Sequence, residues 1–224
     1  TEKYIVTNAI NGTLTISKRS VTLTSADDEK VYDGTALTND TVTVSGDGFV
    51  EGQGATYAVT GSQKEVGESK NTFTYELNKG TEAKNYTITP EYGTLKVTEN
   101  KTEVVVTITE NSGTEKYDGT EKTVTGYKVT SISNPLYTKD DFTFSGNASV
   151  SGTDAGTYNM ELKPSDFKNN NKNFSNVRFE IVDGTLTISK RSVTLTSADD
   201  EKVYDGTALT NDTVTVSGDG FVEG

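Results

Sequence analysis

The sequence predicts an all-β protein built from small tandem domains, with Ig-like β-sandwiches as the favoured fold and β-grasp units as the alternative. Three observations lead to this prediction. The 41 residues from Gly12 to Gly52 recur letter for letter from Gly184 to Gly224, a shift of 172 residues. Stretches rich in Thr, Val, Tyr and Ile alternate apolar and polar side chains with period two, which favours strands. Short turn signals separate these stretches at a spacing typical of small sandwiches.

A second, diverged repeat lies inside the 172-residue period. The sequence Tyr-Asp-Gly-Thr occurs three times, and its glycines are 85 and 87 residues apart. A repeat of about 80–90 residues can bury one small core, so we expect two unlike domains that alternate. The expected divisions are the closing strands of a preceding repeat at 1–19, domain A at 20–99, domain B at 100–189, and the truncated opening part of a further domain A at 190–224.

The strands are expected where apolar side chains fall on one face. In domain A these stretches are 21–24, 41–44, 71–77 and 93–97. In domain B they are 104–108, 127–132, 142–144, 157–162, 177–181 and 184–188. Gly, Asn and Asp cluster between them and close short connections, because these residues tolerate turn conformations. Helix is expected only as a single turn, at 81–85 or 165–169.

Each domain is expected to bury its own core, made of the inward side chains of its strands. For domain A the expected core is Val21, Leu23, Tyr32, Val42, Val44, Phe73, Tyr75, Leu77, Leu95 and Val97. For domain B it is Val104, Val106, Ile108, Tyr158, Met160, Leu162, Phe179, Ile181, Leu186 and Ile188. The links between domains are short: Ser17 to Ser20 before domain A, and Thr98 to Thr102 before domain B. Such links predict domains that lie end to end in a stiff rod.

The composition argues against several classes of function. The chain has no Cys and no His, which argues against disulfides, thiol chemistry, structural zinc and the commonest general base. A net charge of −12 argues against nucleic-acid binding, which needs a basic surface. No stretch is long and apolar enough to span a membrane. We expect no cofactor. The acidic run Asp27-Asp28-Glu29 lacks the alternating spacing of a calcium loop, so no metal site is assigned.

The repeated Tyr-Asp-Gly motif is the one recurrent candidate site. A structural role is favoured, because Asp-Gly is a turn signal and the Tyr can plug the core beside the turn. No phosphate-binding loop, dinucleotide fingerprint or nucleophile elbow is present, so we expect no enzyme and no catalytic residues. The motif residues are Tyr32, Asp33 and Gly34, then Tyr117, Asp118 and Gly119, then Tyr204, Asp205 and Gly206.

Recurrent lysines beside the motif offer a different hypothesis. Domains without cysteine gain most from another covalent staple, such as an isopeptide bond between Lys and Asn beside a buried acid. Lys30, Lys116 and Lys202 are the candidates for the lysine. The sequence identifies neither an Asn nor an acid as a partner.

Several of these motifs together resemble the YDG/MBG-type domains of bacterial surface proteins. They are the stretch from Lys30 to Thr35, Asp154-Ala155-Gly156-Thr157-Tyr158, and Asn85-Tyr86-Thr87-Ile88 followed by Gly93-Thr94-Leu95-Lys96-Val97. The chain departs from the family pattern at two loops: Lys116 directly precedes Tyr117, and Glu65-Val66-Gly67 replaces the Asp-Ala-Gly turn in domain A. The resemblance implies a repetitive stalk outside a bacterial cell, on its surface or wall, with no catalytic residues.

Two functions follow as expectations. The first is a structural spacer that projects a binding domain away from the cell. The second is adhesion or self-assembly by the repeats themselves, with further copies of the repeat as partners. Because the stretches 1–19 and 192–224 hold only parts of a domain, we expect strands of the continuing chain or of a neighbouring molecule to complete the opening fragment.

Overall fold

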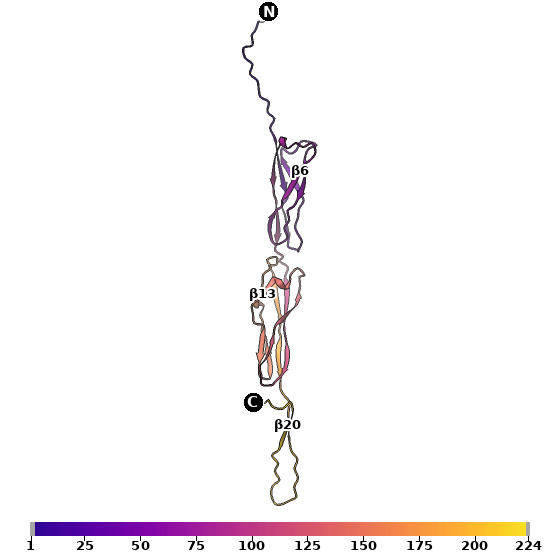
Figure 1. Cartoon of the computed structure of the whole chain (residues 1–224), viewed down its shortest axis with the longest axis vertical. Helices are drawn as coiled ribbons and strands as arrows, with labels where there is room; N and C mark the ends of the chain where they lie inside the picture. The colour runs from indigo at the N-terminus through magenta and orange to yellow at the C-terminus, as the bar shows by residue number, and fades with distance from the viewer. Residues whose placement is uncertain (1–2, 223–224) are drawn as a thin grey trace. The chain divides into compact units, whose positions relative to one another are not determined.

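The structure is a computed structural model that describes residues 3–222, and it confirms the all-β class. Contacts divide the chain into two units, one up to Asn100 and one from Lys101 onward (Figure 1). Helix in the described residues is limited to three short 3-10 turns, as expected: Ala83–Asn85, Lys139–Asp141 and Pro164–Asp166. The first and third lie at or beside the predicted turns, and the second was not predicted.

Unit 1 holds the strands β1 to β8 in three small sheets. The sheet β3-β1-β7 and the sheet β2-β8-β5 have three strands each, and β4 pairs with β6. The bounds are β1 (Arg19–Ser25), β2 (Asp28–Val31), β3 (Val42–Gly46), β4 (Ala55–Val59), β5 (Gly67–Lys70), β6 (Phe73–Leu77), β7 (Tyr86–Glu91) and β8 (Thr94–Thr98).

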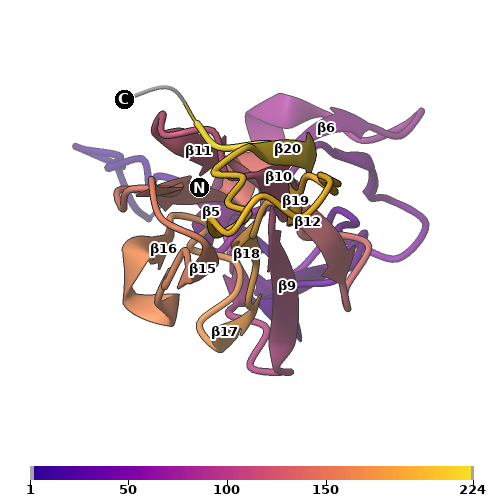
Figure 2. The same cartoon turned by 90° about the horizontal axis from the view of Figure 1, so that it is seen from below.

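Unit 2 repeats this plan in β9 to β18 and adds a hairpin. Its three-stranded sheets are β12-β9-β17 and β10-β18-β15 (Figure 2). The pair β13 with β16 corresponds in chain order to β4 with β6, and the pair β11 with β14 lies where unit 1 has only the antiparallel bridge between Leu37 and Gln63. The bounds are β9 (Val104–Glu110), β10 (Gly113–Lys116), β11 (Lys122–Thr125), β12 (Tyr127–Ile132), β13 (Phe142–Phe144), β14 (Ser149–Gly152), β15 (Gly156–Asn159), β16 (Phe167–Asn169), β17 (Val177–Val182), β18 (Thr185–Ser189), β19 (Val193–Ser197) and β20 (Val214–Gly218).

Both units share one pairing scheme. The first strand pairs antiparallel with one neighbour and parallel with a strand near the end of the domain: β1 with β7, and β9 with β17. The second strand pairs parallel with the closing strand, β2 with β8 and β10 with β18. The three-stranded sheets are therefore mixed. Parallel partner strands need a long connection between them, so they lie far apart in the chain. The turn signals in the sequence indicate neighbouring strands only, and they did not predict these parallel pairs.

The core is largely where the alternation places it. Val21, Leu23 and Leu95 are fully buried in unit 1, and Val104, Val106, Ile108 and Leu186 are fully buried in unit 2. The expectation is wrong for Val44 and Tyr75, which are 43% and 36% exposed. Both lie in strands with one recorded partner strand, β3 beside β1 and β6 beside β4, so their outer faces receive less cover.

Aromatic side chains form a cluster in unit 2 around Phe167. Phe167 contacts Phe142, Phe144, Phe179 and Tyr127, with ring centroids 4.9–6.0 Å apart. Such edge-to-face and stacked pairs add to the burial of apolar area. Of these residues only Phe179 was expected in the core.

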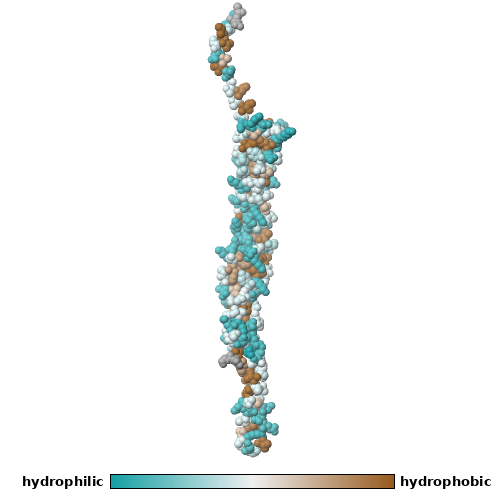
Figure 3. All heavy atoms as spheres, viewed as in Figure 1, coloured by the Kyte–Doolittle hydropathy of each residue, from teal (hydrophilic) through white to brown (hydrophobic). Residues whose placement is uncertain are grey.

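The same sequence has two environments in the described chain. Leu186 and Ile188 in β18 are 0% and 2% exposed, whereas Leu14 and Ile16, at the identical positions of the repeat, are both 100% exposed. Residues 3–18 form no strand, and apolar side chains stand along this stretch (Figure 3). The difference arises because β18 lies between β10 and β15, and the first copy lacks such neighbours among the described residues.

Candidate functional site

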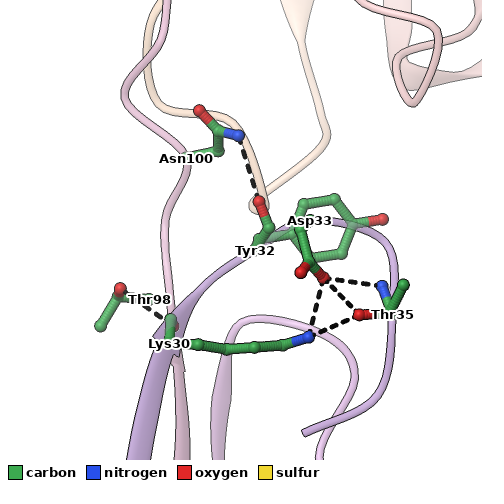
Figure 4. A network of polar contacts seen from close by, with 6 residues as sticks. All are labelled: Lys30, Tyr32, Asp33, Thr35, Thr98 and Asn100. Carbon is green, nitrogen blue, oxygen red and sulfur yellow. Dashed lines mark hydrogen bonds and ion pairs between the residues drawn. The ribbon is translucent and has the colours of Figure 1, made fainter.

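The Tyr-Asp-Gly-Thr turn of unit 1 follows directly on β2. Asp33 Oδ1 accepts three hydrogen bonds, from the backbone N–H of Thr35 (2.9 Å), its hydroxyl (2.7 Å) and Lys30 Nζ (2.8 Å) (Figure 4). Gly34 has φ of +80°, which favours glycine at this position. The backbone of Tyr32 is fixed from both sides, because its N–H donates to Thr98 O (2.9 Å) and its carbonyl accepts from the Asn100 side chain (3.1 Å).

The Tyr-Asp-Gly-Thr turn of domain B has the same geometry, but the lysine that binds its aspartate comes from a different position in the sequence. Asp118 Oδ1 accepts from the backbone N–H of Thr120 (2.9 Å) and its hydroxyl (2.6 Å), while Asp118 Oδ2 accepts from Lys122 Nζ (2.6 Å). The Tyr117 N–H donates to Ser189 O (2.9 Å), as Tyr32 does to Thr98 in unit 1. The lysine that pairs with the motif carboxylate thus precedes it by three residues in unit 1 and follows it by four in unit 2.

The third turn shows that the motif forms without its domain. Asp205 again accepts from the N–H and hydroxyl of Thr207 (2.9 and 2.7 Å) and from Lys202 Nζ (2.9 Å). Yet no strand is recorded directly before or after it, and Tyr204 is 91% exposed. Tyr32, by contrast, is 8% exposed. The turn is therefore local structure, and only the burial of the tyrosine requires a complete domain.

The carboxylates of the three turns are held ionised. The Lys30 ammonium, with the Thr35 donors, holds the pKa of Asp33 well below its usual range. Lys122 and Thr120 do the same for the pKa of Asp118, and Lys202 and Thr207 lower that of Asp205. Hydrogen bonds to the charged form stabilise it, so these side chains serve poorly as general acids or bases near neutral pH.

The recurrent lysines do not share one environment. Lys30 and Lys202 each pair with the aspartate three residues ahead. Lys116 instead pairs with Asp219 at 2.6 Å, and Lys122 takes its place beside the motif. The assumed equivalence of Lys116 with the other two lysines is therefore wrong, because Lys116 is the last residue of β10, whereas Lys30 lies one residue before the end of β2. By register, Lys116 corresponds to Val31.

A buried carboxylate in unit 2 was missed by the sequence analysis. Glu110 is 3% exposed, and its two oxygens accept from the backbone N–H groups of Leu162 (2.6 Å) and Gly184 (2.7 Å). Glu161, next to this contact, has φ of +64° and is the one non-glycine residue with positive φ in the described part of the chain. The signal was available: Glu110 continues the inward alternation of Val104, Val106 and Ile108.

In unit 1, neutral side chains make the hydrogen bonds that the Glu110 carboxylate makes in unit 2. Ser25, at the position of Glu110, donates to Asn71 O (2.5 Å) and accepts from the Gly93 N–H (3.0 Å). The Asn71 side chain donates to the carbonyls of Ala26 and Asn39. Both networks tie the end of the first strand to the loop before the closing strand, so we interpret them as structural.

Neither a metal cluster nor a membrane helix emerges from the residues that the structure describes. Residues 3–222 contain no group of three or more Asp, Glu, His or Cys side chains that could hold a metal ion. Over the same range, no helix is long and apolar enough to cross a membrane.

The fold and turns of unit 2 define a small β-domain held by polar turns and an aromatic core. The model of the MBG domain family matches residues 103–190, so this segment is an MBG-type domain and the predicted resemblance is confirmed there. MBG is a family of non-catalytic β-domains. The search found no matching curated protein and no matching solved structure.

Proposed function

We propose that the chain is a spacer segment of a large repetitive protein on a bacterial cell surface or in its wall. In this role it projects a binding domain away from the cell and carries out no catalysis. The observation that carries the proposal is the 41-residue identity on either side of an unlike domain. Such duplication lengthens a protein without adding a new site.

The domain properties support the spacer role. The motif carboxylates are engaged by Lys and Thr donors within their own turns. The short links between domains predict an end-to-end rod of sandwich-like units, each adding about 30–40 Å at about 3.3 Å per strand residue. The net charge of −12 favours solubility and disfavours lateral association of such a rod.

The experiment is a length series. Chains with one, two and three copies of the 172-residue period are compared by electron microscopy and small-angle X-ray scattering. The proposal expects the maximum dimension to grow by about 60–80 Å per period, the length of two domains. A dimension that stays constant, or grows only as a compact particle does, contradicts it. Binding of the chains to arrays of glycans and matrix proteins would favour adhesion by the repeats.

The exposed apolar ends favour one second candidate function, self-assembly by strand complementation. Leu14 and Ile16 are fully exposed, and Leu195 and Val216 of the hairpin are 59% and 49% exposed. In unit 1 the strand equivalent to β19 is β1, which also pairs with β7. The corresponding stretch around residues 5–10 of a second copy can supply that parallel partner to β19, with edge hydrogen bonds giving affinity.

Self-assembly is tested by sedimentation over a wide concentration range. Complementation expects oligomers that dissociate on dilution, and it expects Leu14→Asp to abolish them. As a control, Val31→Asp changes another exposed apolar residue to the same acid and leaves residues 3–18 intact. A chain that stays monomeric at high concentration rules this function out for the segment.

A further inference from the structure

Asp219 lies at the centre of a polar contact between the MBG-type domain of unit 2 and the hairpin that follows it. Its Oδ2 accepts from the Ser192 N–H (2.8 Å), and its Oδ1 accepts from Lys116 Nζ (2.6 Å). Lys116 ends β10, directly before the Tyr-Asp-Gly turn, whereas Asp219 follows β20. One carboxylate therefore connects the two parts.

The part of this contact that belongs to the hairpin is preformed. Arg191 donates to the carbonyls of Gly220 (2.8 Å) and Asp219, and the Asp219 N–H donates to Ser192 O (2.7 Å). Gly218 has φ of +83°, and a Cβ there would lie 2.6 Å from Ser192 O. The arrangement places the carboxylate of Asp219 at a fixed position.

The first copy of the sequence has the same local structure inside a more complete domain. Arg19 donates to Gly48 O (3.0 Å), the Ser20 N–H donates to Asp47 Oδ2 (2.9 Å), and the Asp47 N–H donates to Ser20 O (2.7 Å). The geometry around Asp219 is therefore a property of the domain A sequence and does not depend on the number of strands that follow.

An apolar contact accompanies the ion pair. The side chain of Val222 lies over the Tyr-Asp-Gly turn of unit 2, where its Cγ1 would be 3.1 Å from a Cβ placed on Gly119. Glycine thus leaves room for the valine. A hollow of about 330 Å³ remains beside the contact and is lined by residues that include Tyr117, Ala155 and Phe221.

We infer that the Tyr-Asp-Gly turn of domain B, with Lys116 beside it, is the docking surface for the domain A that follows. The occupant is the loop 219–222 of the next repeat in the same chain. The turn has a second role besides closing β10: its glycine receives Val222, and its preceding lysine holds Asp219.

The chemistry of this surface also selects the order of domains. At the register position of Lys116, domain A has Val31. At the position of Asp219 and Asp47, domain B has Ser133, whose N–H donates to Val105 O and whose hydroxyl accepts from the Val105 N–H. Lysine and aspartate therefore meet only where A follows B, and a junction of B with B lacks the aspartate.

The absence of cysteine makes the inference testable by pulsed electron spin resonance. Spin labels are placed on Thr123→Cys in β11 and Thr194→Cys in β19, two exposed threonines. We expect a narrow distance distribution at low salt. Lys116→Ala and Asp219→Asn should each broaden it, and added salt should broaden it in the parent but not in Lys116→Ala, because exposed ion pairs are screened.

The control is Lys168→Ala, which removes the same charge from an exposed position on β16 and should leave the distribution narrow. Circular dichroism verifies that each variant retains its strands. The inference is overturned by a parent distribution as broad as that of Lys116→Ala, or by a Lys116→Ala distribution as narrow as that of the parent.

A second, longer chain tests the same contact in case the hairpin 192–222 is too unstable without the rest of its domain. Because 12–52 and 184–224 are identical, appending residues 53–100 after Gly224 continues the second domain A without a foreign joint. The same labels should again give a narrow distribution. A matched chain joins domain B to a second domain B by appending residues 101–189 after Ser189. Its labels are on Thr123 and on the second copy of Thr107, the position equivalent to Thr194. Its distance distribution should be broad. An equally narrow distribution would refute the selection of domain order.

Discussion

Leucine at the same repeat position should contribute very differently to stability in its two copies. Leu186 is 0% exposed between β10 and β15, whereas Leu14 is 100% exposed. The neighbours in sequence are identical, so differences in strand propensity cancel when Leu186→Ala is compared with Leu14→Ala. The comparison isolates tertiary burial.

The expected cost of Leu186→Ala is about 3–5 kcal/mol. Loss of the buried side chain accounts for about 2–3 kcal/mol, and the cavity left between two strands adds the rest. Leu14→Ala should change the free energy of unfolding by less than about 0.5 kcal/mol, as for other exposed positions.

The chain contains a built-in reporter for this measurement. Its single methionine, Met160, is 6% exposed in unit 2, so one ¹³C-methyl signal follows the urea unfolding of that unit. Tyrosine fluorescence follows the whole chain. A cost below about 1 kcal/mol for Leu186→Ala would refute the packing argument. Equal costs for both variants would show that Leu14 is buried in solution and would favour strand complementation.

Further predictions concern unit 2. Glu110→Ala should cost about 2–5 kcal/mol, because two buried N–H groups lose their acceptor; unchanged urea unfolding would contradict this. Gly184→Ala should destabilise, since its Cβ would lie 2.3 Å from a backbone oxygen, whereas Gly12→Ala, with open space around it, should be neutral by the same assay. The lowered pKa of Asp118 means that its contribution is present above about pH 4 and is lost as pH falls further; carboxyl NMR should show no titration at pH 4, and an ordinary midpoint would contradict this. Burial raises the pKa of Tyr137 to about 12, so stability should hold below about pH 10 and fall between pH 10 and 12; Tyr137→Phe should remove this alkaline loss, and an unchanged loss would disprove the assignment.

Period-two alternation predicted many of the strands that carry large apolar side chains, because burial of one face fixes their pattern. β1, β9 and β18 are examples, but β4 and β7 were not among the expected strands. The alternation also missed β2 and β5, whose sequences Asp-Glu-Lys-Val and Gly-Glu-Ser-Lys carry little apolar signal and form strands through the ladder to β8. Pairing between distant strands overrides local preference in such cases.

The candidate site was predictable where its contacts are local. Asp33 and Thr35 are two residues apart, so the turn follows from the motif itself. The partner of Lys116 lies 103 residues away, and its position depends on two separate strand registers. The inward position of Glu110 was readable from the alternation, but its two N–H donors come from loops that no pattern in the sequence brings together.

The parallel pairing of β1 with β7 and of β2 with β8 has a consequence for a domain under tension. A pull on the start of β1 and on the end of β8 acts along these strands and in opposite directions. It therefore shears the ladders, and the hydrogen bonds of each ladder share the load, whereas a hairpin pulled at its two ends opens one bond at a time. Unit 2 repeats the arrangement in β9 with β17 and β10 with β18. Forced unfolding depends on the height of the barrier rather than on equilibrium stability, so domains of this topology can withstand pulling well beyond what their small cores suggest.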